Sequence, residues 1–232
     1  MGMKSATMSA THALRDKWFV SFLPLLTADM VNTDYKGNWQ LAAQERTQKL
    51  DWITSVEELW STMNSLPKVH QLGMGSTLIF ARNNKEPPSY EAYPNGSRIM
   101  INLLKPPTTD AGLELVLAVV MGETAAEKAS DGKPVCDVLR IAARPSREHS
   151  EQIRVEVWLS DSTRSHAVAE FLAEAMRAKG LAANSYNIAE ASFDAAAPGK
   201  DKKVLAASTM PSPSSPPMVK DAAALEHHHH HH

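Results

Sequence analysis

Metal-binding and disulfide-forming residues are nearly absent from this chain. Cys136 is the only cysteine, and the run His227–His232, which follows Leu225-Glu226 and is typical of an expression tag, accounts for six of the ten histidines. The other histidines are scattered without ligand-like spacing: His12, His70, His149 and His166. We therefore expect no structural metal, no cofactor and no disulfide.

Long apolar runs and a strong net charge are missing as well. No stretch approaches the roughly 20 apolar residues of a membrane span, and the segment from Met1 to Ser5 lacks the apolar core of a signal peptide. We expect a soluble cytoplasmic protein without membrane contact. The formal net charge of -2 argues against a broad basic surface for long nucleic acids. A small anionic ligand held by a few arginines stays possible.

Catalytic motifs are also lacking. The sequence has no Walker-type phosphate loop, no Gly-x-Ser-x-Gly elbow and no His-Glu-x-x-His, and Cys136 lies in an expected strand without an obvious histidine partner. A nucleotide-processing enzyme is disfavoured because no metal-binding carboxylate cluster is visible. We expect a binding protein and not an enzyme.

The composition favours one folded domain with flexible ends. A chain of 232 residues with 43% hydrophobic residues can bury a single sizeable core. Residues 1–11 are predicted to be disordered, residues 12–194 to form the domain, and residues 195–224, rich in Ala, Pro, Ser and Lys, to stay unpacked before the tag at 225–232.

The hydrophobic pattern predicts short strands and a few helices. Strands are expected at 17–22, 76–81, 98–103, 136–143 and 153–159, helices at 55–66, 110–122 and 163–179, and a long loop from Leu25 to Asn38. Several strands with few crossover helices favour an α+β class, an antiparallel sheet with helices packed on one face.

Two of these elements place side chains for binding. The pattern Thr54-Ser55-Val56-Glu57 marks a helix start and puts Trp60 on an apolar stripe. Alternation in the strand 153–159 puts Arg154 and Trp158 on one face, away from the aliphatic face that should meet the helices. In the loop after Pro87-Pro88, the ring of Tyr90 is followed directly by the carboxylate of Glu91, and a ring with an acceptor can read a base.

These residues resemble a known family over about residues 12–191. The landmarks are His12-Ala13-Leu14, Lys17-Trp18, Trp39-Gln40, Ser55 to Trp60, Pro88 to Glu91, Gly96-Ser97-Arg98, Met121-Gly122-Glu123 and Val155 to Trp158. In this order and spacing they resemble eukaryotic translation initiation factor 4E, the messenger-RNA cap-binding protein. The resemblance implies a curved antiparallel sheet with helices on its convex face and the cap site on its concave face.

The resemblance assigns a ligand site. The 7-methylguanine base would lie between Trp39 and Tyr90, because methylation makes the base cationic and strengthens its stacking on aromatic rings. Glu91 would accept hydrogen bonds from the guanine edge, and Trp158 would touch the methyl group. The phosphate bridge would be held by Arg144 and Arg154, with Arg147 in the neighbouring loop as an addition.

The resemblance also assigns a partner surface and a set of partners. His12, Leu14, Val56 and Trp60 match positions that receive a helix carrying a tyrosine and a later leucine with an apolar neighbour. At the position where that surface is acidic in the family, this chain has either Glu114 or, in its place, Leu115. The expected partners are capped mRNA and a scaffold initiation factor or binding protein, with the chain itself a monomer.

Plainer interpretations stand beside these assignments. Trp39 and Trp60 could be core residues, Tyr93 could be the stacking ring in place of Tyr90, and the arginines could form a solvated face. The family's usual second stacking tryptophan is a tyrosine here, which marks a divergent member, as expected for one of several paralogues in a protozoan-like lineage. It also motivates an alternative function, a protein-binding adaptor of the same fold with weak or lost cap binding.

Overall fold

One antiparallel sheet organises the chain. The structure is a computed structural model that describes residues 11–194 and the strand 201–206. The described strands form a sheet in the order β2-β1-β3-β5-β6-β4-β7-β8, and every neighbouring pair is antiparallel. Their bounds are β1 Ala13–Leu23, β2 Gln48–Ser55, β3 Thr77–Arg82, β4 Ser97–Leu103, β5 Val138–Ala143, β6 Ile153–Leu159, β7 Tyr186–Ser192 and β8 Asp201–Ala206. The predicted α+β class is therefore confirmed.

The helices pack mainly on one face of this sheet. Their bounds are α1 Ala28–Tyr35, α2 Trp39–Arg46, α3 Val56–Ser65, α4 Thr108–Met121, α5 Thr124–Ala129 and α6 Ser165–Ala178, with short 3-10 turns η2 Val69–Gln71, η3 Tyr90–Ala92, η4 Ser162–Arg164 and η5 Ala183–Ser185. Side chains of α3, α4 and α6, such as Leu59, Leu117 and Leu172, share one buried core with Ile101 and Val155 of the sheet. None of the described helices has both the length and the apolar character needed to cross a membrane.

Local capping explains where the main helices begin and end. Ser55 accepts a hydrogen bond from the backbone of Glu58 at 3.1 Å, and the Glu58 carboxylate accepts one from the Thr54 backbone at 2.8 Å. The helix predicted at 55–66 is therefore present, as α3. Helix α6 is followed by Gly180 at a φ of 83°, a conformation that favours glycine.

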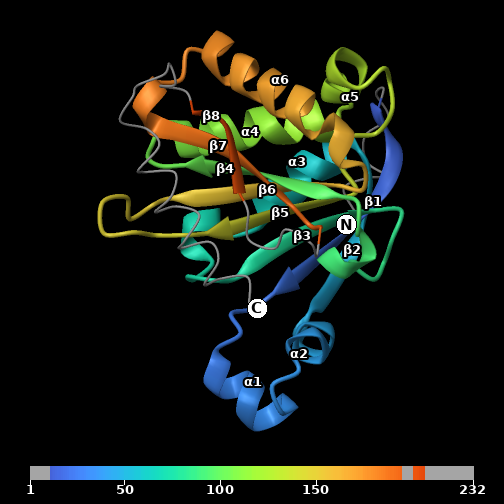
Figure 1. The fold of residues 1–232 in the computed structure, drawn as a ribbon, viewed down its shortest axis with the longest axis vertical. Coiled ribbons are helices and arrows are strands. Elements are labelled where there is room, and N and C mark those ends of the chain that lie inside the picture. The colour runs from blue at the N-terminus through green and yellow to red at the C-terminus, as the bar shows by residue number, and fades with distance from the viewer. Residues whose placement is uncertain (1–10, 195–200, 207–232) are drawn as a thin grey trace.

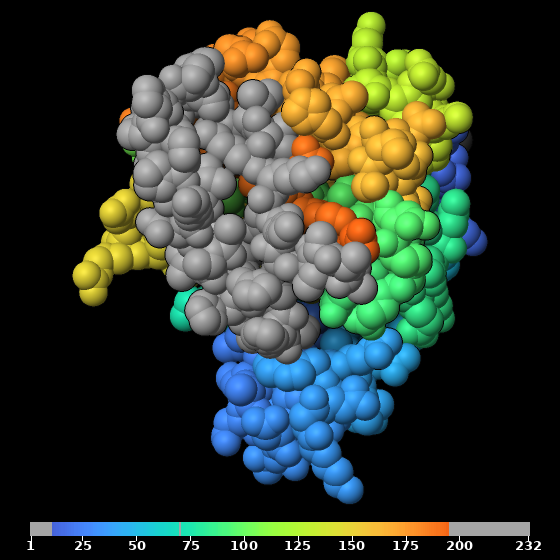
Figure 2. Space-filling view, viewed as in Figure 1, coloured from blue at the N-terminus to red at the C-terminus, as the bar shows by residue number. Residues whose placement is uncertain are grey.

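The loop expected from Leu25 to Asn38 is wrong, because this segment contains α1 and leads into α2. Thr27 caps α1 and Asn38 caps α2 with their side-chain oxygens, while Lys36 and Gly37 turn the chain with φ values of 52° and 80°. Figure 1 shows both helices projecting away from the sheet, and Figure 2 shows the same segment, in blue, protruding from the surface. The two helices pack chiefly against each other.

Three strands were not expected. β2 has a largely polar sequence, and β7 contains only two residues that are typical of strands, Tyr186 and Ile188, so neither gives a strong local strand signal. Both gain their backbone partners from neighbours distant in sequence, β1 and β4 respectively. β8 pairs with β7 and lies in the segment predicted to be unpacked; the rest of that tail and residues 1–10 are outside the described residues.

A buried guanidinium ties distant parts of the chain together. Arg82 at the end of β3 lies 4.4 Å from the ring centre of the fully buried Trp18 and donates to the carbonyl of Cys136 at 2.8 Å. It also pairs with Asp16 at 2.8 Å and Glu123 at 2.9 Å. Glu123 has a φ of 67°, which is unfavourable for a non-glycine residue. Arg82 therefore holds a strained turn between α4 and α5 against β1.

Replacing Arg82 should destabilise the fold. We expect Arg82→Met to lower the free energy of unfolding by about 3 kcal/mol, because Asp16 and Glu123 would keep their charges without a buried partner. Urea denaturation followed by circular dichroism measures the change. The matched control is Arg177→Met, which breaks an exposed pair with Glu174 on α6 and should change little. Equal effects of the two substitutions would contradict this role for Arg82.

Candidate functional site

The sheet has a second face, opposite the helices, and it carries charged side chains. Along β6, Ile153, Val155 and Val157 belong to the main core beneath the helices. Arg154, Glu156 and Trp158 alternate with them and therefore lie on the second face. The strand and the facing inferred from the sequence are both present in the structure.

Glu156 is the negative centre of this face. It is buried, and its carboxylate accepts hydrogen bonds from Arg98 at 3.2 Å and from the indole nitrogen of Trp158 at 2.9 Å. In the sheet register it lies opposite Arg140 on β5 and Met100 on β4. Burial alone would raise the pKa of Glu156, but Arg98, Arg140, the bond from Trp158 and Arg154 hold it well below its usual range. Glu156 is therefore ionised at neutral pH.

Several arginines lie close enough to Glu156 to affect its charge. Burial lowers the pKa of both Arg140 and Arg144, an effect that Glu156 opposes and that the charge of Arg98 increases. The Nε atom of Arg144 is buried and has no hydrogen-bond partner among the described residues. Arg154 donates from Nε to Asn102 on β4 at 2.8 Å. Arg144 therefore keeps one buried donor that no described residue accepts from.

The predicted phosphate-binding arginines do not share one environment. Arg144 follows β5 directly, and its backbone nitrogen is bonded to Gln152 across the β5–β6 turn at 2.8 Å. Arg154 is half-buried within β6. Arg147 is exposed in the turn between the two strands, so it stands apart from the buried charges around Glu156.

Trp158 is on the expected face but is covered. Only 5% of the residue is exposed, and it forms a small cluster with Ile79 and Val138. The Phe193 ring packs edge-on against it at 5.1 Å, and the Arg140 guanidinium lies 5.1 Å from its ring centre. Side chains of the protein therefore surround this tryptophan in the structure.

Tyr90 and Glu91 lie in the 3-10 turn η3, which begins just after Pro87 and Pro88. Tyr90 is 46% exposed, and its ring centre is 6.0 Å from that of Phe193. The exposed Glu91 accepts a hydrogen bond from the Ser89 hydroxyl at 3.2 Å. Tyr93 instead packs against the Trp158 cluster, and burial raises the pKa of its hydroxyl to about 12. Of the two tyrosines, Tyr90 is the more accessible.

Trp39 begins α2 and is half-exposed. Asn38 before it caps the helix, and Gln40 after it continues the helix. Among the described rings, Tyr90 contacts Phe193, and Trp39 and Tyr90 form no stacked pair. Figure 1 shows α2 in the segment that projects from the sheet.

The residues assigned to the partner surface lie around the start of α3. The backbone and ring nitrogens of His12 contact the Glu57 carboxylate at 2.7 and 2.8 Å, and the His12 carbonyl accepts a bond from Val56. Hydrogen bonds from His12 lower the pKa of Glu57. Leu14 is buried in the main core, while Val56 and Trp60 are partly buried against it.

On α4 the two candidates for the acidic position are separated. Glu114 is exposed, while Leu115 is partly buried against the main core together with Val119 one turn later. The described surface at this helix is therefore apolar where α4 meets the core and acidic at its outer edge.

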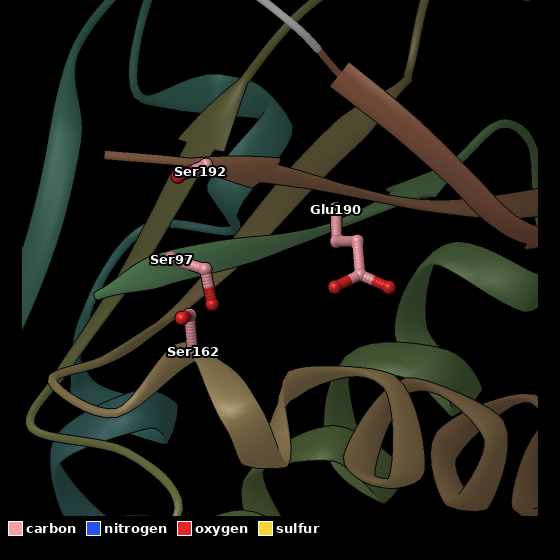
Figure 3. A pocket seen from close by; sticks show the side chains of 4 residues that line it. All are labelled: Ser97, Ser162, Glu190 and Ser192. Carbon is pink, nitrogen blue, oxygen red and sulfur yellow. The ribbon is translucent and has the colours of Figure 1, made fainter. Parts of the chain in front are cut away.

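A small pocket lies elsewhere, on the helix side of the sheet. Ser97, Ser162, Glu190 and Ser192 line it between β4, β7 and the start of α6 (Figure 3). Glu190 accepts a hydrogen bond from Ser165 at 2.6 Å. The lining has hydroxyls and a carboxylate but no ring or guanidinium, so it differs chemically from the second face.

Four residues of the second face were not identified from the sequence as site residues: Arg98, Arg140, Glu156 and Phe193. Arg98 and Arg140 lie in predicted strands, but only the register of β4 and β5 against β6 brings them to Glu156. Phe193 follows the unpredicted strand β7. The missing signal is strand order, which local patterns do not contain.

Comparisons with known proteins give one family. The profile described as Eukaryotic initiation factor 4E matches residues 13–203. No match was found among curated proteins.

Several solved structures are similar in fold. Ascaris suum eIF4E-3 in complex with an m7G cap gives a TM-score of 0.59 at 16% identity, covering 80% of this chain and 93% of that chain. The complex of Ascaris suum eIF4E-3 with an m2,2,7G cap gives a TM-score of 0.60 at 16% identity, covering 83% of this chain and 97% of that chain. C. elegans eIF4E-3 in complex with the 4E-binding protein Mextli gives a TM-score of 0.54 at 16% identity, covering 72% of this chain and 88% of that chain.

Removing the charge of Glu156 should destabilise the protein. We expect Glu156→Gln to cost about 3 kcal/mol of unfolding free energy at pH 7, because buried arginines would lose their counter-charge. The folded pKa of Glu156 lies below its unfolded value, so its contribution is present above the unfolded pKa of about 4.3 and is lost as the pH falls below it. Guanidinium denaturation at pH 7 and at lower pH should show the difference between parent and variant shrinking in acid.

The control for this prediction is Glu174→Gln, an exposed carboxylate on α6 that pairs with Arg177. We expect little change at any pH. A Glu156→Gln protein as stable as the parent at pH 7 would contradict the central role of this carboxylate.

Proposed function

The chain belongs to the eukaryotic initiation factor 4E family, and on that premise we propose that it binds the 7-methylguanosine cap of mRNA in the cytoplasm and acts in translation initiation. The observation that carries the proposal is the group of arginines on the second face, next to a tryptophan, in which the Nε atom of Arg144 is buried and has no hydrogen-bond partner among the described residues. A ligand with linked phosphates and a methylated base complements both features. No catalytic step is part of this proposal.

The phosphate bridge would lie against Arg144 and Arg154. A phosphate there would restore a negative charge beside guanidinium groups whose burial now lowers the pKa of Arg144 and Arg140. Arg98 and Arg140 extend the positive field, while Arg147 could reach the ligand only from the exposed turn. Glu156 lies near Arg98, Arg140 and Arg154, and its negative charge offsets the repulsion among these arginines in the free protein.

The base would be enclosed by Trp39 and Tyr90. N7 methylation gives guanine a positive charge, which strengthens its attraction to the faces of both rings. Glu91 would accept hydrogen bonds from the N1 and N2 donors of the guanine edge, and adenine lacks that donor pair. Trp39 lies on the projecting α1–α2 segment, so the base would be enclosed between that segment and the η3 turn.

A second surface would bind a scaffold or regulatory protein through a helix. Val56 and Trp60 on α3, with Leu115 and Val119 on α4, are apolar side chains that pack on the core while retaining accessible area. An amphipathic helix that buries apolar anchors on such a surface fits this arrangement. His12 is held at its edge by Glu57, and Glu114 offers a negative charge to the partner.

A protein-binding adaptor with weak cap affinity is the second candidate. It is favoured by the smaller ring at Tyr90 and by the near-complete burial of Trp158. Such a protein would keep the surface around Trp60 and lose useful affinity for the cap.

A titration separates the two functions. We expect 7-methylguanosine triphosphate to quench tryptophan fluorescence and unmethylated GTP to bind far more weakly, because only the methylated base is cationic. By calorimetry, Trp39→Ala should weaken cap binding about 30-fold or more, and Glu91→Ala should weaken it and relax selectivity for guanine.

Glu86→Ala is the matched control for Glu91, since it removes another exposed carboxylate from the same loop. Its cap affinity should equal that of the parent. If the methylated ligand causes no quenching and no heat of binding, the adaptor function stands in place of cap binding. Parent-like binding by Glu91→Ala would remove that residue from the site.

The partner surface is tested by Trp60→Ala. We expect it to weaken a synthetic helical peptide, carrying a tyrosine followed by a leucine with an apolar neighbour, by about 30-fold, because a central tryptophan anchor is lost. Cap affinity should be nearly unchanged. Fluorescence anisotropy of the labelled peptide measures the peptide affinity, and calorimetry measures the cap affinity.

The control is Trp52→Ala, another half-buried tryptophan that packs on Phe19 at the β1–β2 edge. It should leave peptide binding intact. Unfolding of Trp60→Ala, seen by circular dichroism, would assign Trp60 to the core instead of the interface.

A further inference from the structure

Phe193 contacts two of the rings assigned to the ligand, Tyr90, proposed to stack on the base, and Trp158, expected to touch its methyl group. It lies just beyond β7, and its backbone nitrogen donates to the carbonyl of Gly96 at 3.0 Å. Its ring centre lies 6.0 Å from that of Tyr90, tilted by 35°, and 5.1 Å from that of Trp158, nearly perpendicular at 67°. One side chain therefore contacts both rings at once.

The base of a bound cap has to make the same pair of contacts. It would stack on Tyr90 while its methyl group touches Trp158, yet Trp158 is only 5% exposed. The methyl group can reach that ring only if a covering side chain moves. Phe193 is half-buried and packs on the cluster of Ile79, Val138 and Trp158, so it is a covering group that also touches Tyr90.

We infer, on the basis of the proposed function, that the Phe193 side chain occupies the base site in the free protein and turns aside when the ligand binds. Phe193 thereby lowers the affinity of the site for the ligand, although it makes no recognition contact with the bound base. The hydrogen bond to Gly96 fixes its backbone, so a rotation of the side chain suffices. The ring has no polar group, and its displacement breaks no side-chain hydrogen bond.

This role has a distinctive consequence for selectivity. The contacts of Phe193 with Tyr90 and Trp158 exist only in the free protein, so their loss on binding weakens every base ligand by the same factor. A ring that stacked on the bound base would instead favour the cationic methylated form. The ratio of the two affinities therefore distinguishes an occupying ring from a recognition ring.

The test compares Phe193→Ala, Phe193→Leu and the parent by calorimetry with 7-methylguanosine triphosphate and with GTP. We expect Phe193→Ala to bind both ligands about fivefold more tightly, the size of a typical aromatic pair contact, with the ratio of the two affinities unchanged. Phe193→Leu, which keeps an apolar side chain without the ring, should lie between. Phe171→Ala, which removes a partly buried ring of α6 that packs on the main core, should leave both affinities unchanged.

Weaker binding by Phe193→Ala, an unchanged affinity, or a lower preference for the methylated ligand would overturn the inference. Thermal unfolding of each variant confirms that it is folded during the titration, and Phe193→Leu supplies the comparison if the alanine variant is not. If neither parent nor variants bind either ligand, the proposed cap-binding function fails as well. Binding by the parent with no gain in Phe193→Ala rejects the role of Phe193 alone.

Discussion

The ionised carboxylate of Glu156 is the interaction on which the second face depends. An antiparallel sheet that buries one face under helices usually leaves the other to solvent, but here that face holds buried guanidinium groups. Arg98 bonds to Glu156 directly, and the charges of Arg140 and Arg154 act on it as well. Without this carboxylate the arginines would repel one another. With it, their charges are partly offset, and the buried Nε atom of Arg144 still has no hydrogen-bond partner among the described residues.

The two ends of the proposed ligand site differ in how they are built. Arg154 and Glu156 are held on a strand inside the sheet, so the proposed phosphate end has its geometry fixed by β6. Tyr90 lies in a short turn and Trp39 on a segment that packs chiefly on itself. Binding groups on such segments can move more easily than groups in a sheet. The proposed base end therefore depends on elements outside the sheet.

The main core separates the proposed ligand site from the proposed partner surface. Side chains of α3 and α4 enter this core from one side, and β6 contributes Val155 and Val157 from the other. Arg82 links β3 to β1 and to the turn before α5, so the layers are fixed relative to one another. A protein with this layout can hold two ligands on different surfaces without direct contact between them. The main core thus lies between the proposed ligand site and the proposed partner surface.

The sequence by itself determined the antiparallel α+β class, the capped start of α3 and the facing of Arg154 and Trp158, because caps and alternation depend on neighbouring residues. Local patterns failed at α1, α2, β2 and β7: the caps Thr27 and Asn38 were present but unrecognised, and the strands take their partners from distant chain segments. Only the tertiary structure decided that Arg98 and Arg140 meet Glu156, that Trp158 is covered, and that Phe193 lies between Tyr90 and Trp158. Strand order and register bring these residues together, and neither is encoded in the spacing of residues along the chain.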